Sequence, residues 1–296
     1  MDRPLRRGAA ALLLPHRPVQ EVRHYGITVP KTWDEFRKAA EKVKKKDKDV
    51  RLASFPKSDA SQLAALAWQA GGKWFGIKGD AWSTGVNDAA TKKVAAYWDG
   101  LVKDDLVQTF TAYTPEETKA RAYGTTLSYL GASWSAGGMK TALPDLKGEW
   151  AAAPMPNWGT AASGNLGGSS YGVLKGSKHT EAATEFITWL TTNKAGVEAR
   201  LADLESPSSA LPADLDMRKV AAAKFDTSYF NGQDLYALAS QQAGTIVPGW
   251  TWGPDQMDVY TAIQDATAKS GFTAGVDAGE QKARSGIKDR GLKLAE

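Results

Sequence analysis

The chain reads Tyr25-Gly-Ile-Thr-Val-Pro-Lys-Thr-Trp-Asp-Glu-Phe36 where its regular patterning begins. Thr32 and Glu35 stand at the spacing of a capping box, which satisfies backbone N–H groups in the first turn of a helix. Apolar side chains then recur at helical spacing, at Trp33, Phe36, Ala40 and Val43. The stretch therefore predicts a helix over residues 33–45 and marks where the folded part of the chain starts.

Short apolar runs alternate with helical patterns along the rest of the chain. We expect strands over residues 51–55, 125–130, 150–155 and 171–174. We expect helices over residues 59–70, 88–103, 181–191, 195–204, 211–225, 235–242, 254–269 and 276–292, with shorter ones after Thr114 and before Leu143. Strands interleaved with helices in this way are typical of an α/β architecture.

The first 24 residues differ in composition from the remainder. They hold five arginines against two acidic residues, and because the whole chain has a formal net charge of +4, the remainder is nearly neutral. The segment from Arg6 to Pro15 is similar to a signal peptide, but its apolar run has only six residues and no small-residue cleavage site follows. We predict that residues 1–25 are a leader outside the fold, without stable structure.

Composition excludes several kinds of function. The chain has no cysteine, which rules out disulfides, thiolate metal sites and a thiol nucleophile. The three histidines (His16, His24 and His179) are scattered, so we expect neither a metal site nor a cofactor. A nearly neutral body offers no basic stripe for nucleic acid, and we interpret the lysine-rich run over residues 42–48 as a solvated helix end.

One serine motif invites an enzymatic interpretation. Gly168-Ser169-Ser170-Tyr171-Gly172 matches the Gly-x-Ser-x-Gly elbow of hydrolases, which needs a strand before the serine and a helix after it. Here a glycine-rich loop precedes the serine and a strand-like run follows, so the context is wrong. No pair of carboxylates is marked out for glycoside hydrolysis. The sequence favours a binding protein that is not an enzyme, with a carbohydrate-active hydrolase using tryptophan platforms and paired carboxylates as the alternative.

A tryptophan pair gives the strongest indication of a ligand. In an extended segment, residues i and i+2 point to the same side, so Trp250 and Trp252 would present two flat rings together. Such rings suit a sugar, which has both C–H faces and hydroxyl groups. The alternative is that both rings fill the core, because large aromatic side chains are mostly buried.

Several segments in order resemble one known family. They are residues 25–36, Gly131-Ala-Ser-Trp134, Gly167-Gly-Ser-Ser-Tyr-Gly-Val-Leu174, residues 177–183 with residues 186–190, and Tyr229-Phe-Asn-Gly-Gln233. Together they resemble the extracellular solute-binding proteins (family 1) of bacterial carbohydrate ABC importers, the family that includes maltose-binding protein. The resemblance covers about residues 25–296.

This resemblance implies a periplasmic-binding-protein-like (type II) α/β fold, in which two lobes close around a sugar. Residues 26–170 and 213–296 would form the C-terminal lobe, and residues 171–212 a remnant of the N-terminal lobe. The ligand-binding positions that it implies are Trp134, Trp250, Trp252, Gly168, Ser169, Asp59 and Ser61. The aromatic side chain that the family places near Ser61 is missing from the sequence at that point.

The implied function is that of the substrate-binding component of an ABC-type sugar importer. Such a component is an extracytoplasmic, cell-surface protein, active as a monomer, that delivers a sugar to membrane permease subunits. The family's first lobe, roughly a hundred residues, has no counterpart before Tyr25, and neither does its signal peptide or lipid-anchor cysteine. We therefore expect a truncated copy with weak or absent sugar affinity, with apolar helix faces exposed at Phe186 and Leu190 and with a tendency to aggregate.

Overall fold

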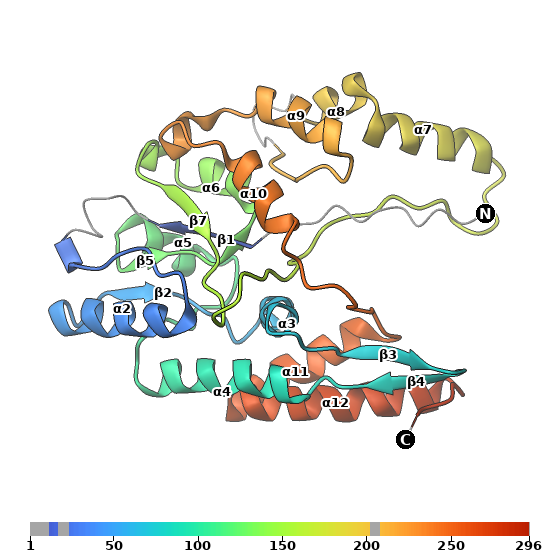
Figure 1. Cartoon of the computed structure of the whole chain (residues 1–296), viewed down its shortest axis with the longest axis horizontal. Coiled ribbons are helices and arrows are strands. Elements are labelled where there is room, and N and C mark those ends of the chain that lie inside the picture. Colours follow the sequence, from blue (N-terminus) through green and yellow to red (C-terminus); the bar gives the residue numbers. More distant parts are fainter. Residues whose placement is uncertain (1–11, 17–23, 202–207, 296) are drawn as a thin grey trace.

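The computed structural model describes residues 12–16, 24–201 and 208–295. A central sheet runs through the molecule in the strand order β2-β5-β1-β6, and β7 also pairs with β1 (Figure 1). Its strands are β1 (Leu12–His16), β2 (Arg51–Ala53), β5 (Thr126–Ser128), β6 (Gly131–Ala132) and β7 (Ala151–Pro154). Strand β2 is parallel to β5, whereas β1 is antiparallel to β5, β6 and β7. The mixed strands and helices confirm the predicted α/β class.

Helices surround this sheet on both sides (Figure 1). Those before the glycine-rich loop are α2 (Trp33–Lys46), α3 (Ala60–Gln69), α4 (Ala89–Lys103), α5 (Pro115–Ala122), α6 (Ser135–Ala142) and the short η1 (Pro144–Leu146). Those after it are α7 (Thr180–Thr192), α8 (Lys194–Leu201), α9 (Leu215–Lys224), η2 (Thr227–Phe230), α10 (Leu235–Ala243), α11 (Gln256–Ser270) and α12 (Phe272–Asp289). No helix in the described ranges is both long and apolar enough to cross a membrane.

The predicted start of the first helix is confirmed. The Thr32 hydroxyl accepts a hydrogen bond from the Glu35 backbone N–H at 3.2 Å, and α2 begins at Trp33. Trp33 and Phe36 are almost fully buried, and the main core continues through a stack of Phe55 on Trp98, whose ring centres are 3.8 Å apart. The capping box and the apolar face of α2 therefore fix one wall of the core.

The prediction that residues 1–25 lie outside the fold is wrong at Leu12–His16. These residues form β1, and Leu13 pairs with Gly131 of β6 on one side and with Pro154 of β7 on the other. Strand β7 is joined to the sheet through β1. The run that resembles a short signal peptide has instead the length of a strand, and pairing on both edges satisfies its backbone. The predicted leader's residues 1–11 and 17–23 lie outside the described residues.

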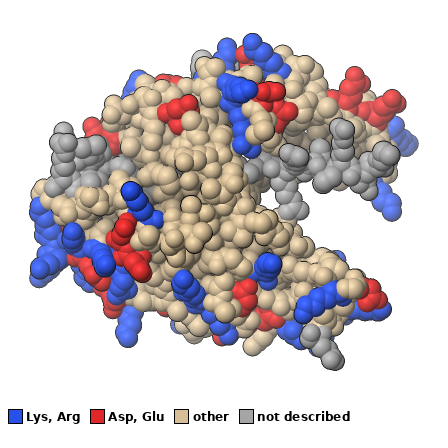
Figure 2. Space-filling model, viewed as in Figure 1, with Lys and Arg blue, Asp and Glu red and all other residues tan. Residues whose placement is uncertain are grey.

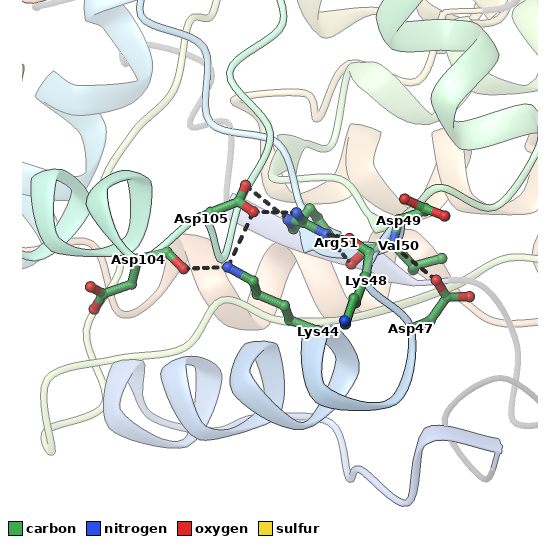
Figure 3. A network of polar contacts seen from close by, with 8 residues as sticks. All are labelled: Lys44, Asp47, Lys48, Asp49, Val50, Arg51, Asp104 and Asp105. Atoms are coloured by element: carbon green, nitrogen blue, oxygen red, sulfur yellow. Dashed lines mark hydrogen bonds and ion pairs between the residues drawn. The ribbon is translucent and has the colours of Figure 1, made fainter.

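An ion-pair cluster fixes α2, β2 and the end of α4 to one another (Figure 3). The buried Arg51 guanidinium donates to Asp105 through Nε at 3.2 Å, and the Lys44 ammonium lies 3.1 Å from the same carboxylate. Lys44 also donates to the Asp104 carbonyl at 2.8 Å. These contacts set the position of β2, which leads directly into the segment that carries Asp59.

The structure differs from the sequence predictions in one expected strand and in one hairpin that was not expected. Residues 171–174 are not a strand, because none of the described strands pairs with them. A hairpin of β3 (Phe75–Lys78) and β4 (Ala81–Thr84) lies where we predicted no element. Gly79, at φ +62°, forms the tight turn that lets these two strands pair.

Helix α7 forms an arm that none of the other described helices covers (Figure 1). None of its residues is buried, and the side chain of Phe186 is 58% exposed. The predicted exposure of an apolar face is thus confirmed at Phe186, and Leu190 is intermediate. Figure 2 shows the outline hollowed between this arm and the β3–β4 hairpin, with acidic and basic side chains interspersed over the visible face.

Candidate functional site

Trp134 occupies the turn between β6 and α6, where it is half-buried. Its indole Nε1 donates to the carbonyl of Leu166 at 3.0 Å, which fixes the plane of the ring. Gly167 follows at φ +69°, and a Cβ at this position would lie 3.1 Å from the indole nitrogen. The glycine-rich loop thus lies directly beside the indole because residue 167 has no side chain.

A cavity of about 820 Å³ opens beside Trp134. Its lining comes from the glycine-rich loop, α7, α8 and the start of α9: Ser133, Trp134, Gly167, Gly168, Ser169, Ser170, Tyr171, Ile187, Thr191, Thr192, Arg200, Ser208, Ala210, Leu211, Pro212, Ala213 and Asp214. Three of the predicted ligand positions, Trp134, Gly168 and Ser169, therefore lie together. The lining mixes hydroxyl groups with apolar surface and has one cationic and one anionic side chain.

Asp59 and Ser61 lie at the start of α3, as predicted, but neither lines this cavity. Asp59 caps the helix, since its Oδ1 accepts from the Ser61 backbone N–H at 3.0 Å and from the Ser61 hydroxyl. Its second oxygen accepts from the phenol of Tyr113 at 3.3 Å. The Tyr113 ring centre in turn is 6.4 Å from that of Trp134. Tyr113 thus connects the two predicted positions.

Tyr113 is a neighbour of Trp134 that the sequence did not identify, and it does not itself line the cavity. It places a ring beside Asp59 and Ser61, where the family resemblance implied an aromatic side chain and the local sequence has none. It also has φ +64°, a left-handed conformation that non-glycine residues rarely adopt. A signal was available in the helix start at Thr114-Pro115, because a turn before a helix is a common place for a functional side chain.

The predicted pair Trp250 and Trp252 lies in a separate aromatic cluster. Trp250 stacks on Trp68 with ring centres 4.9 Å apart and planes 5° apart, and Trp74 lies against it at 5.5 Å. The planes of Trp250 and Trp252 are 77° apart, so they do not form one flat platform. Neither residue lines the cavity at Trp134. A role for this pair in ligand contact stays a prediction.

The serine of the hydrolase-like motif has no catalytic setting. Residues 168–174 are irregular, with no strand before Ser170, the serine of the motif, and no helix directly after it. Asp59, the carboxylate that reaches Trp134 through Tyr113, is occupied in capping α3. Among the described residues, no group of histidine, aspartate and glutamate side chains could hold a metal ion.

Comparison with known families places this geometry in context. Residues 19–197 match the family model for bacterial extracellular solute-binding proteins. The chain belongs to this family. The match begins at residue 19, inside the predicted leader but after strand β1.

Two curated relatives are sugar-binding proteins. The chain is 30% identical over 161 residues to the lactose-binding protein of Rhizobium radiobacter. The aligned residues make up 53% of this chain and 36% of the relative. The chain is 28% identical over 171 residues to the arabinooligosaccharide-binding protein of Bacillus subtilis (strain 168), covering 56% of this chain and 39% of the relative. The chain thus spans little more than a third of the length of either relative.

Solved structures share the fold. A binding protein associated with an ABC transporter of B. animalis subsp. lactis Bl-04, in complex with β-1,6-galactobiose, superposes with a TM-score of 0.82 at 24% identity over 99% of this chain and 74% of that chain. The galacto-N-biose-/lacto-N-biose I-binding protein of Bifidobacterium longum gives the same TM-score at 24% identity, over 98% and 72%. The type II periplasmic-binding-protein fold predicted from the sequence is confirmed.

Proposed function

We propose that this family member is the sugar-binding component of an ABC importer. It captures a short saccharide beside Trp134, with the weak affinity expected from the sequence, and delivers it to membrane permease subunits. The observation that carries the proposal is an open cavity lined by the Trp134 indole, whose ring centre lies 6.4 Å from that of Tyr113. Aromatic rings with one polar end suit a ligand that has both C–H faces and hydroxyl groups.

A galactose-containing saccharide is the first ligand to test. One curated relative is named for lactose, and the two solved structures with the highest similarity given above hold β-1,6-galactobiose and lacto-N-biose. The mixed cavity lining supports a ligand without net charge, because Arg200 and Asp214 contribute opposite charges. Gly168 and Ser169 would contact the same ligand through backbone and hydroxyl groups.

The wider setting follows from the family. We infer an extracytoplasmic location and a monomer that works with permease subunits. We also infer that residues 26–170 and 213–296 act as one lobe, and residues 171–212 as part of a second. The exposed α7 supports this division, since none of its residues is buried against the other described elements.

Binding without chemistry is part of the proposal. The carboxylates close to Trp134 and Tyr113 are engaged in structure: Asp59 caps α3, Asp214 caps α9, and Glu117 accepts hydrogen bonds from Ser54 and Tyr113. Incubation with lactose or β-1,6-galactobiose should release no new reducing sugar. Release that depends on Asp59 would support the hydrolase alternative instead.

Calorimetric titration with lactose, β-1,6-galactobiose and arabino-oligosaccharides tests the proposal. We expect Trp134→Ala to weaken binding of the preferred sugar at least about tenfold, or about 1.4 kcal/mol, because the ring stacks on the ligand. Trp189→Ala is the matched control, since Trp189 is a partly exposed tryptophan on α7 that does not line the cavity. Failure of every sugar to bind the unaltered chain, or equal losses in both variants, would contradict the proposal.

A further inference from the structure

A buried ion pair lies beneath the turn that carries Tyr113. Glu117 and Arg121, one turn apart on α5, are only 2% and 7% exposed, and the Arg121 Nη1 is 3.5 Å from the Glu117 Oε1. The Arg121 guanidinium also lies over the ring of Tyr129 at 4.5 Å. Glutamate and arginine are seldom fully buried unless they are paired, and a buried pair needs further hydrogen bonds to offset its loss of hydration.

Each oxygen of Glu117 has a distinct partner. Oε2 accepts a hydrogen bond from the backbone N–H of Tyr113 at 2.9 Å, and Oε1 accepts from the hydroxyl of Ser54 at 3.0 Å. Ser54 follows β2 directly, so Glu117 ties the Tyr113 turn to the edge of the central sheet. A hydrogen bond from a backbone N–H to a buried carboxylate is charge-assisted, and stronger than one to a neutral acceptor.

The backbone of Tyr113 needs such support. At φ +64° an L-residue with a full side chain is less stable than in an ordinary conformation by about 1–2 kcal/mol. In return, this conformation leaves Tyr113 59% exposed, with its hydroxyl hydrogen-bonded to Asp59 and its ring centre 6.4 Å from that of Trp134. Strained residues of this kind persist only where their surroundings hold them in place.

We propose that Glu117 is the positioning residue of the candidate sugar site. It holds Tyr113 in the left-handed conformation and so aims the phenol at Asp59 and the ring at Trp134. Glu117 itself is buried and contacts no ligand. The inference rests on the proposed function for its effect on affinity, but its effect on Tyr113 can be measured without any ligand.

The first test follows Tyr113 directly in the whole chain. With 3-fluorotyrosine incorporated, the fluorine resonance of Tyr113 is assigned as the one that disappears in Tyr113→Phe. We expect Glu117→Ala to shift or broaden this resonance, because the turn loses its acceptor. Glu117→Gln should restore most of the signal, since its amide oxygen can still accept the Tyr113 N–H.

Ser54→Ala is the matched control. It removes the other hydrogen-bond partner of Glu117 but leaves the Oε2 contact to Tyr113 in place. We expect Ser54→Ala to lower the melting temperature and leave the Tyr113 resonance unmoved. A purely structural role would be indicated if Glu117→Ala and Glu117→Gln both left the Tyr113 resonance unchanged, or if Ser54→Ala moved it equally. Either result would overturn the inference.

The second test is sugar affinity. If the unaltered chain binds one of the sugars named above, Glu117→Ala should weaken it about tenfold and Glu117→Gln much less, whereas Ser54→Ala should leave it unchanged. Unchanged affinity in folded Glu117→Ala would overturn the link to the site. If no sugar binds the unaltered chain, the proposed function fails, and the fluorine spectra alone decide whether Glu117 positions Tyr113.

Discussion

Gly167 shows how closely one residue can control the candidate site. Its φ of +69° strains any other residue, and a Cβ there would press on the Trp134 indole nitrogen at 3.1 Å. Gly176 also has a positive φ, +92°, but a Cβ there would meet nothing within 4 Å. The two glycines therefore separate the backbone requirement from the contact with Trp134.

We predict that Gly167→Ala and Gly176→Ala each destabilise the chain by about 1–2 kcal/mol, because both force alanine into a left-handed backbone. Urea denaturation measures this loss. Only Gly167→Ala should also change the fluorescence of Trp134, measured as the difference from the same variant carrying Trp134→Phe. A matching fluorescence change in Gly176→Ala would show that the loop as a whole, and not the contact at residue 167, determines the orientation of the Trp134 indole.

For single residues, the sequence predicted which side chains belong to the candidate site better than it predicted how they are arranged. Trp134, Gly168 and Ser169 were expected to lie together, and they line one cavity. Trp250 stacks instead on Trp68, which lies 182 positions earlier in the chain and whose indole donates to the Val247 carbonyl. Residue spacing within one segment cannot reveal a partner from a distant helix, so the orientation of the ring was beyond sequence analysis.

Elements with local signals were the predictable ones. Helix α2 starts at its capping box, and α5 starts at Thr114-Pro115, because the residues that satisfy the first turn are adjacent in sequence. Strands depend on partners instead. Leu12–His16 was missed although it pairs on both edges, and residues 171–174 were predicted as a strand although no described strand lies beside them.

The ion-pair cluster of Figure 3 gives an element-scale prediction on pH. Hydrogen bonds from Arg51, and then from Lys44, hold the pKa of Asp105 below its ordinary value of 3.8. A carboxylate with a lowered pKa in the folded state adds stability that is complete above its unfolded-state pKa. That contribution is lost as the pH falls through the lower folded-state value.

We therefore expect Asp105→Asn to destabilise the chain near neutral pH by about 1 kcal/mol, a modest value because Asp105 is largely exposed and its charge is screened. The difference from the unaltered chain should vanish below the folded-state pKa of Asp105. Denaturation curves at neutral and strongly acidic pH measure both quantities. Asp265→Asn is the control, since this exposed aspartate on α11 forms no ion pair with any of the described residues. An Asp105→Asn deficit that persists in strong acid would exclude the ion pair as its cause.

At the scale of the whole molecule, the main asymmetry is between a packed body and an exposed arm. One large core extends through α2, α3, α4, α11 and α12, whereas α7 has no buried residue. On α7 the rings of Phe186 and Trp189 lie 6.2 Å apart and are 58% and 41% exposed. Leu174, just before the arm, is 84% exposed. Apolar groups gathered in this way mark a surface that promotes association.

We predict that the chain, a monomer when dilute, self-associates with rising concentration, and that the Phe186→Ser, Trp189→Ser double variant does so much less. The physical reason is removal of apolar area from water on association, and serine takes that area away without touching the core. Sedimentation velocity over a wide concentration range measures the effect.

Met257→Ser is the control, because Met257 is 71% exposed but lies on α11, away from the arm. If the double variant and the Met257 variant sediment alike, association arises elsewhere and α7 is simply a solvated helix. If only the double variant stays monomeric, the arm is the surface through which the isolated chain aggregates, as its unburied aromatic rings indicate.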